Sequence, residues 1–121
     1  ILAKIREVDV LVTPELQDRV FEGHPEVTFA GMRGGRPMER PKKSREGLAD
    51  RLDVLRDHFP EIDRVVTTRR QAGVGRDDLV DAFAMLWTAR RVATGRARRL
   101  PDGGVDAIQR DPRGLQAEML A

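Results

Sequence analysis

Three aspartates within five residues, Asp77, Asp78 and Asp81, open an apolar segment whose pattern predicts a long helix. Residues three or four positions apart share a helix face, so Asp78 and Asp81 can point the same way. Carboxylates at this spacing can hold a divalent metal ion. Acids at a helix start also favour the helix dipole and cap free N–H groups, and Asp77 is predicted to be such an N-cap. The cluster therefore has two open interpretations, a metal site or a cap with an ion pair.

Asp81 is the most informative of the three, because it lies a full turn inside the helix among apolar neighbours. A buried carboxylate needs compensation, from an arginine or from a metal ion. Two metal ions about 3.5–4 Å apart can clamp a phosphodiester, which requires acids from separate elements. Glu22, at the end of a predicted strand, is the second candidate ligand, although it could equally face solvent. Glu26 is a weaker candidate.

The charge distribution points to an anionic partner. The net charge is only +2, and the pI of 9.6 reflects a chain with no Tyr or Cys, so the pI is weak evidence by itself. Residues 63–100, however, carry nine Arg against four Asp. Such a segment is expected to draw in nucleic acid in a salt-sensitive way, the alternative being an ordinary solvated surface. The candidate nucleic-acid-binding residues are Lys42, Lys43, Arg69, Arg70 and Arg76.

Composition excludes several other classes. The absence of cysteine removes disulfides, thiolate zinc sites and a cysteine nucleophile. His24 and His58 do not have zinc-motif spacing, and few aromatic residues argue against a platform for stacking bases. No apolar run approaches the roughly 20 residues of a membrane span. A cytoplasmic protein without a membrane partner is expected.

The pattern along the chain predicts helices, strands and one charged loop. Leu48, Leu52, Leu55 and Phe59 form one apolar stripe on a helix capped by Ser44. Leu79, Phe83 and Leu86 form another, widened by Val80, Ala84 and Trp87. The expected elements are helices over 26–32, 44–59 and 77–94, a loop over 33–43, and strands over 19–22, 62–68 (or an extended connection) and 114–121.

Several ordered motifs resemble one family. They are EGHPEVTF (22–29), GGRP (34–37), KKSREG (42–47), DDLVDAFA (77–84) and DPRGL (111–115). Together, from about residue 2 to the end, they are similar to the DUF429 family of predicted ribonuclease H-like nucleases. The acidic element at Asp78 and Asp81 also resembles the last acidic motif of Holliday-junction resolvases of that superfamily.

The resemblance implies an α/β fold, a ribonuclease H-like mixed sheet flanked by helices, present as a C-terminal portion. Residues 1–121 would be a single domain, part of a larger one. Glu22 would match the acid on the middle strand, and Asp78 and Asp81 the acids opening the last helix. The superfamily's first catalytic aspartate has no match and would precede Ile1.

The implied activity is Mg²⁺- or Mn²⁺-dependent hydrolysis of phosphodiester bonds, with Glu22, Asp78 and Asp81 as catalytic metal ligands. The alternative is a non-catalytic module that binds nucleic acid or protein. A third possibility is a structural fragment that pairs with a second copy through an exposed sheet edge.

Overall fold

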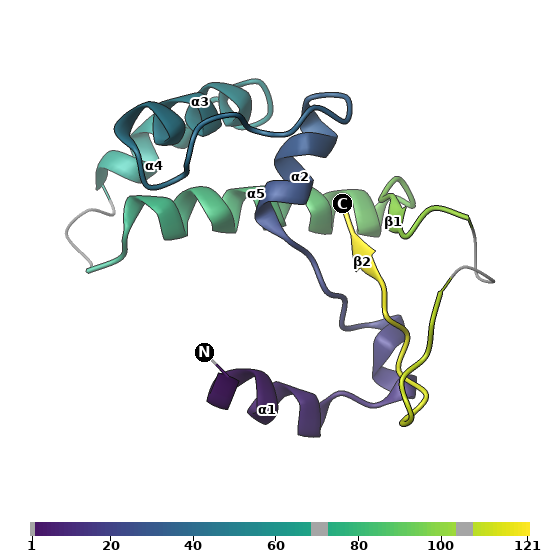
Figure 1. The fold of residues 1–121 in the computed structure, drawn as a ribbon. Coiled ribbons are helices and arrows are strands. Elements are labelled where there is room, and N and C mark those ends of the chain that lie inside the picture. Colours follow the sequence, from purple (N-terminus) through teal and green to yellow (C-terminus); the bar gives the residue numbers. More distant parts are fainter. Residues whose placement is uncertain (1, 69–72, 104–107) are drawn as a thin grey trace. The chain divides into compact units, whose positions relative to one another are not determined.

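The computed structural model describes residues 2–68, 73–103 and 108–121, which fall into two compact units (Figure 1). Unit 1 comprises Ile1–Glu22 and Arg98–Leu120, and unit 2 comprises Gly23–Ala97 with Ala121. Unit 2 contains α2 (Pro25–Met32), α3 (Arg45–Arg56), α4 (Ile62–Thr68) and α5 (Arg76–Ala93). Unit 1 contains α1 (Leu2–Leu11), a 3₁₀ helix (Pro14–Asp18), and strands β1 (Arg99–Leu100) and β2 (Met119–Leu120).

Unit 2 is a helical cluster built on α5, which α2, α3 and α4 all contact (Figure 1). Its core draws at least one side chain from each helix. Phe29 of α2, Leu55 of α3 and Ile62 of α4 are fully buried. The remaining core residues are Phe59, Val66, Val80 and Ala84.

The helix α3 forms as predicted. Ser44 is its N-cap, and the Ser44 Oγ accepts a hydrogen bond from the Gly47 N–H at 2.9 Å. Leu55 and Phe59 are buried, while Leu48 and Leu52 pack against the core, so the predicted stripe faces inward. The capping residue and the 3.6-residue period together account for where this helix begins and which face it buries.

The long helix α5 is confirmed, but its start and rotation differ from the prediction. Gly75 is the N-cap, and Asp77 lies in the first turn, so the prediction of Asp77 as the N-cap was wrong. The buried line of the helix is Val80, Ala84 and Thr88, whereas Leu86 is 41% exposed. The Thr88 hydroxyl is satisfied by a 2.8 Å hydrogen bond to Thr28 on α2, which lets a polar residue occupy the core side.

The predicted α/β fold, a ribonuclease H-like mixed sheet flanked by helices, was wrong. The described residues contain one sheet, the antiparallel pair β1–β2, in which Arg99 pairs with Leu120 and Leu100 with Met119. Segment 62–68 is the helix α4, because Ile62 and Val66, four residues apart, both reach the core. Packing of that face outweighs the strand preference of β-branched side chains. The predicted strand 114–121 is reduced to Met119–Leu120.

The predicted strand at 19–22 is also absent, and Glu22 does not end one. Val20 and Phe21 are 48% and 39% exposed, so this segment has no buried face of its own to order a strand. Glu22 is exposed, and its backbone carbonyl accepts a 2.8 Å hydrogen bond from the Leu120 N–H within unit 1. The described helices include none that is both long and apolar enough to cross a membrane.

Candidate functional site

The centre of the candidate site is an ion pair between Lys42 and Asp81. The Lys42 Nζ lies 2.7 Å from Asp81 Oδ2, and the two side chains are 40% and 23% exposed. The second carboxylate oxygen, Asp81 Oδ1, is buried and has no hydrogen-bond partner among the residues that the structure describes. The sequence required that this carboxylate be compensated, and Lys42 compensates one of its two oxygens.

Asp77 and Asp78 both lie in the first turn of α5. Asp77 is half-buried and lies four residues before Asp81, whereas Asp78 is exposed. A Cβ placed on Gly75 would lie 2.6 Å from Asp77 Oδ1 and 3.0 Å from Asp78 Oδ2. Both carboxylates therefore turn back over Gly75, where they favour the helix dipole. Asp77, rather than Asp78, shares the half-buried face with Asp81.

Glu26 is committed to a different partner, the buried Arg51. The Arg51 Nε and Nη2 donate to Glu26 Oε1 at 2.9 Å and Oε2 at 2.6 Å, respectively. Arg51 is 3% exposed, and its Nη1 also donates to the carbonyls of Gly47 at 2.7 Å and Arg40 at 3.1 Å. Since both Glu26 oxygens are engaged, Glu26 contributes charge to its surroundings and is not a free ligand.

The acids around Lys42 raise the pKa of its ammonium group. Its hydrogen bond to Asp81 raises the pKa of Lys42 above its usual value of 10.5, and the charges of Asp81, Asp77 and Glu26 add to that effect against the desolvation of the ammonium. A raised lysine pKa stabilises the folded state below the usual pKa. This stabilisation is lost as the pH rises through the folded-state pKa.

We therefore expect Lys42→Met to lower the free energy of unfolding at pH 8 by up to about 1 kcal/mol, the range for solvent-screened pairs. The difference in unfolding free energy between the variant and the wild type should become smaller as the pH rises above 10.5. Urea unfolding at pH 8 and at higher pH measures it, with Lys43→Met as the exposed neighbouring control. A gap that is constant with pH, or one equal to that of the control, contradicts the role of the pair.

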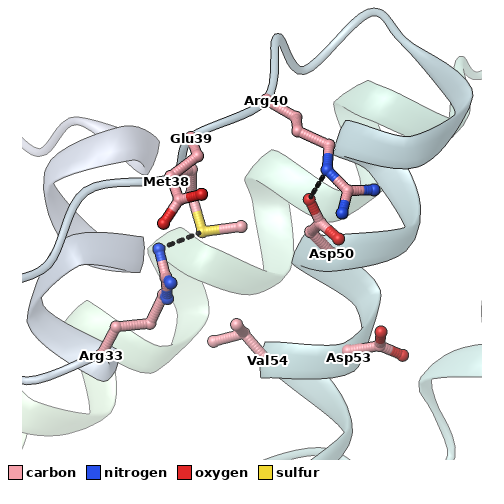
Figure 2. A pocket seen from close by; sticks show the side chains of 7 residues that line it. All are labelled: Arg33, Met38, Glu39, Arg40, Asp50, Asp53 and Val54. Carbon is pink, nitrogen blue, oxygen red and sulfur yellow. Dashed lines mark hydrogen bonds and ion pairs between the residues drawn. The ribbon is translucent and has the colours of Figure 1, made fainter.

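A shallow pocket lies between α3 and the loop before it (Figure 2). Its wall includes an ion pair in which Arg40 Nε lies 3.4 Å from Asp50 Oδ2. The lining combines two arginines with three acids, so the pocket offers no concentrated charge of either sign. The lining residues are Arg33, Met38, Glu39, Arg40, Asp50, Asp53 and Val54.

The predicted site residues are distributed over both units. Asp78 and Asp81 lie on α5 in unit 2, where Lys42 pairs with Asp81, whereas Glu22 lies in unit 1. Within the described ranges, no three His, Asp or Glu side chains are grouped so that they could hold a metal ion.

The structure describes some of the predicted nucleic-acid-binding residues and not others. Lys43 and Arg76 are exposed, as expected of residues that bind a large partner. Arg69 and Arg70 lie outside the described residues.

Sequence reasoning had missed two contributions to this site. One is the Lys42–Asp81 pair, whose partners are 39 residues apart, and the other is the Arg51–Glu26 pair, 25 residues apart. Only the need of Asp81 for a partner was visible in the sequence. No spacing rule identifies which distant cation will supply it.

Comparison with known proteins places the chain in a family. A family model described as "Protein of unknown function (DUF429)" matches residues 1–104. The chain belongs to the DUF429 family. No curated protein and no solved structure matches it.

Proposed function

We propose that this chain contributes to the metal-dependent hydrolysis of phosphodiester bonds in nucleic acid, with Asp81 as the central ligand. The observation that supports this proposal is that the two oxygens of the Asp81 carboxylate differ in their hydrogen bonding. Oδ2 accepts a hydrogen bond from Lys42, and Oδ1 is buried without a hydrogen bond from any residue in the described part of the chain. A buried oxygen left unpaired costs free energy, and a divalent cation would remove that cost.

The acids of α5 suit Mg²⁺ or Mn²⁺. Mg²⁺ prefers oxygen ligands and usually takes one or two carboxylates together with waters and substrate phosphate. Asp81 and Asp77 share the half-buried face, so they are the proposed ligands in unit 2. Asp78 is the further ligand in unit 2 that the sequence predicts, whereas Glu22 belongs to unit 1 and is not part of this proposed site. When bound, the ion would supply a Lewis acid and an activated water molecule.

Lys42 has a separate role in this proposal. Its ammonium group is held by Asp81, and its pKa is raised, so Lys42 is fully protonated at neutral pH. A fixed positive charge beside the metal ligands would stabilise the negative charge that develops on a phosphoryl group under attack. Asp81 would thus position Lys42 as well as bind the metal.

A non-catalytic binding module is the second candidate function. It is favoured by the pairing of the acids, since Lys42 neutralises Asp81 and Arg51 neutralises Glu26. The lack of a grouped set of three ligands among the described residues also favours it. In that case the two pairs only hold the helices together.

Titration with Mn²⁺ tests the proposal. We expect Asp81→Asn to weaken Mn²⁺ binding, followed by electron paramagnetic resonance, at least about tenfold, because the amide removes the ligand charge. Asp57→Asn is the matched control, since it makes the same charge change at an exposed position, the C-cap of α3. Equal Mn²⁺ affinities of the two variants would contradict Asp81 as a ligand.

Cleavage assays separate the two candidate functions. The chain is incubated with labelled DNA and RNA, single-stranded and structured, in Mn²⁺. Cleavage that is lost in Asp81→Asn and retained in Asp57→Asn supports the nuclease. Binding of these substrates without any cleavage supports the non-catalytic module.

A further inference from the structure

We infer that the segment 33–45, here called the basic segment, binds the phosphate backbone of the nucleic acid. This inference rests on the proposed function, because it names the surface that would hold the same substrate. The segment carries six basic residues and one acid, a denser positive charge than the Arg-rich stretch after it. It also ends beside the Lys42–Asp81 pair, so a strand bound along it would run to the candidate metal ligands.

Half of the cations in the basic segment are already engaged within unit 2. Lys42 pairs with Asp81, and Arg40 pairs with Asp50. Arg33 donates to the carbonyl of Pro37. These contacts order the segment, and the two ion pairs neutralise part of its charge.

The other three cations, Arg36, Lys43 and Arg45, are exposed, and none of them forms an ion pair with an acid among the described residues. Arg36 has only a 3.3 Å hydrogen bond from its Nε to the carbonyl of Arg33. Three uncompensated cations within ten residues are a surface that attracts phosphates and releases their counterions.

The backbone of the segment is held on both sides of Lys43. On one side, Arg51 donates to the Arg40 carbonyl at 3.1 Å. On the other, the hydroxyl and the N–H of Ser44 donate back to the Pro41 carbonyl, at 2.8 Å and 3.0 Å, and close a turn that contains Lys43. A cation on an already ordered backbone loses less conformational entropy on binding than one on a free chain. The segment is therefore a preorganised surface and not merely a charged loop.

The surroundings favour nucleic acid over a membrane. Leu86 and Val74 are the large apolar residues exposed among the described part of unit 2, and neither is in the basic segment. A membrane-binding surface would pair its cations with inserted apolar side chains. The basic segment contains no aromatic residue, and Phe29 is buried and Trp87 partly buried against the core, so stacking of bases on this segment is not expected. Contacts to the backbone phosphates, independent of base sequence, are expected.

The test is binding of a fluorescein-labelled single-stranded 20-nucleotide DNA by anisotropy, in EDTA so that cleavage does not occur. The triple variant Arg36→Gln, Lys43→Gln, Arg45→Gln should weaken binding about tenfold and reduce the slope of log K against log salt by about 2–3. The control, Lys4→Gln, Arg6→Gln, Arg19→Gln, removes two Arg and one Lys at exposed positions of unit 1. It should change the affinity less than about twofold. Equal losses in the two triple variants would overturn the inference.

Two further measurements separate this inference from the proposed function and from a lipid partner. Asp57→Asn, at an exposed position outside the basic segment, should bind the DNA in EDTA as tightly as the wild type. If the triple variant loses DNA binding but the wild type shows no cleavage in Mn²⁺, the result supports the basic segment as the DNA-binding surface and contradicts the proposed nuclease activity. If the chain binds phosphatidylserine vesicles through these three cations and does not bind the DNA, nucleic acid as the partner is overturned.

Discussion

Replacing Arg51 with alanine is expected to lower the free energy of unfolding by about 3 kcal/mol, because it leaves the acceptors around a buried guanidinium without their donor. Arg51 is 3% exposed and makes four hydrogen bonds, two to Glu26 and one each to the carbonyls of Gly47 and Arg40. The variant leaves all these acceptors without their donor. It also removes the contact of the guanidinium with the Phe29 ring, 5.8 Å from the ring centroid. The free energy of unfolding of a typical domain is only about 5–15 kcal/mol, so this loss would be a large part of it.

Urea unfolding followed by circular dichroism measures this effect. Arg45→Ala is the control on the same helix, because Arg45 is exposed and should change stability by no more than about 0.5 kcal/mol. A double variant, Arg51→Met with Glu26→Met, should recover part of the loss, since it leaves no unpaired charge. Equal stabilities of Arg51→Ala and Arg45→Ala would show that the buried pair does not hold unit 2 together.

The parts of the fold that followed from the sequence are those fixed by local rules. Ser44 caps α3 because its side chain can bond an N–H three residues ahead, and this needs no distant partner. Likewise, Gly34 and Gly35 have φ values of 66° and 90°, in the left-handed region that favours glycine, and they follow α2 where the sequence placed its end.

The errors arose where tertiary packing decides the outcome. Segment 62–68 is rich in β-branched residues, which favours a strand in isolation. It is a helix because the helical conformation places both Ile62 and Val66, four residues apart, in the core. The rotation of α5 was misjudged for a related reason. Ala84 and Thr88 pack inward, and this rotation of the helix brings Asp77, rather than Asp78, to the half-buried face with Asp81.

The candidate site shows the same division. The position of Asp81, a turn inside an apolar helix, was enough to predict that the carboxylate is compensated. The identity of the compensating group depended on where the basic segment lies, and contacts outside α5 hold that segment, among them the hydrogen bonds from Arg51 to the Arg40 carbonyl and from Ser44 to the Pro41 carbonyl. The stability of unit 2 and the geometry of the Lys42–Asp81 pair thus depend on the same buried guanidinium.

Gly47→Ala should destabilise the protein even though alanine is the better helix former. In an exposed helix interior the change would gain about 1 kcal/mol. Here a Cβ on Gly47 would lie 2.8 Å from the Pro41 carbonyl carbon and 2.9 Å from Ser44 Oγ, and closer still to the Pro41 oxygen. Backbone atoms cannot move aside as a flexible side chain can. We expect a net loss of about 1–3 kcal/mol, the usual cost of overpacking, or somewhat more.

Gly31→Ala is the matched comparison and should have the opposite sign. Gly31 lies within α2, and a Cβ there would meet only the Trp87 ring at 3.9 Å, an ordinary contact. Its gain should be about 0.5–1 kcal/mol. Thermal or urea unfolding of both variants gives the two signs directly. Because the Gly47 clash is with the backbone of the basic segment, Gly47→Ala should also weaken DNA binding in EDTA, while Gly31→Ala leaves it unchanged. Stabilisation by both alanines would show that the segment does not pack closely on α3.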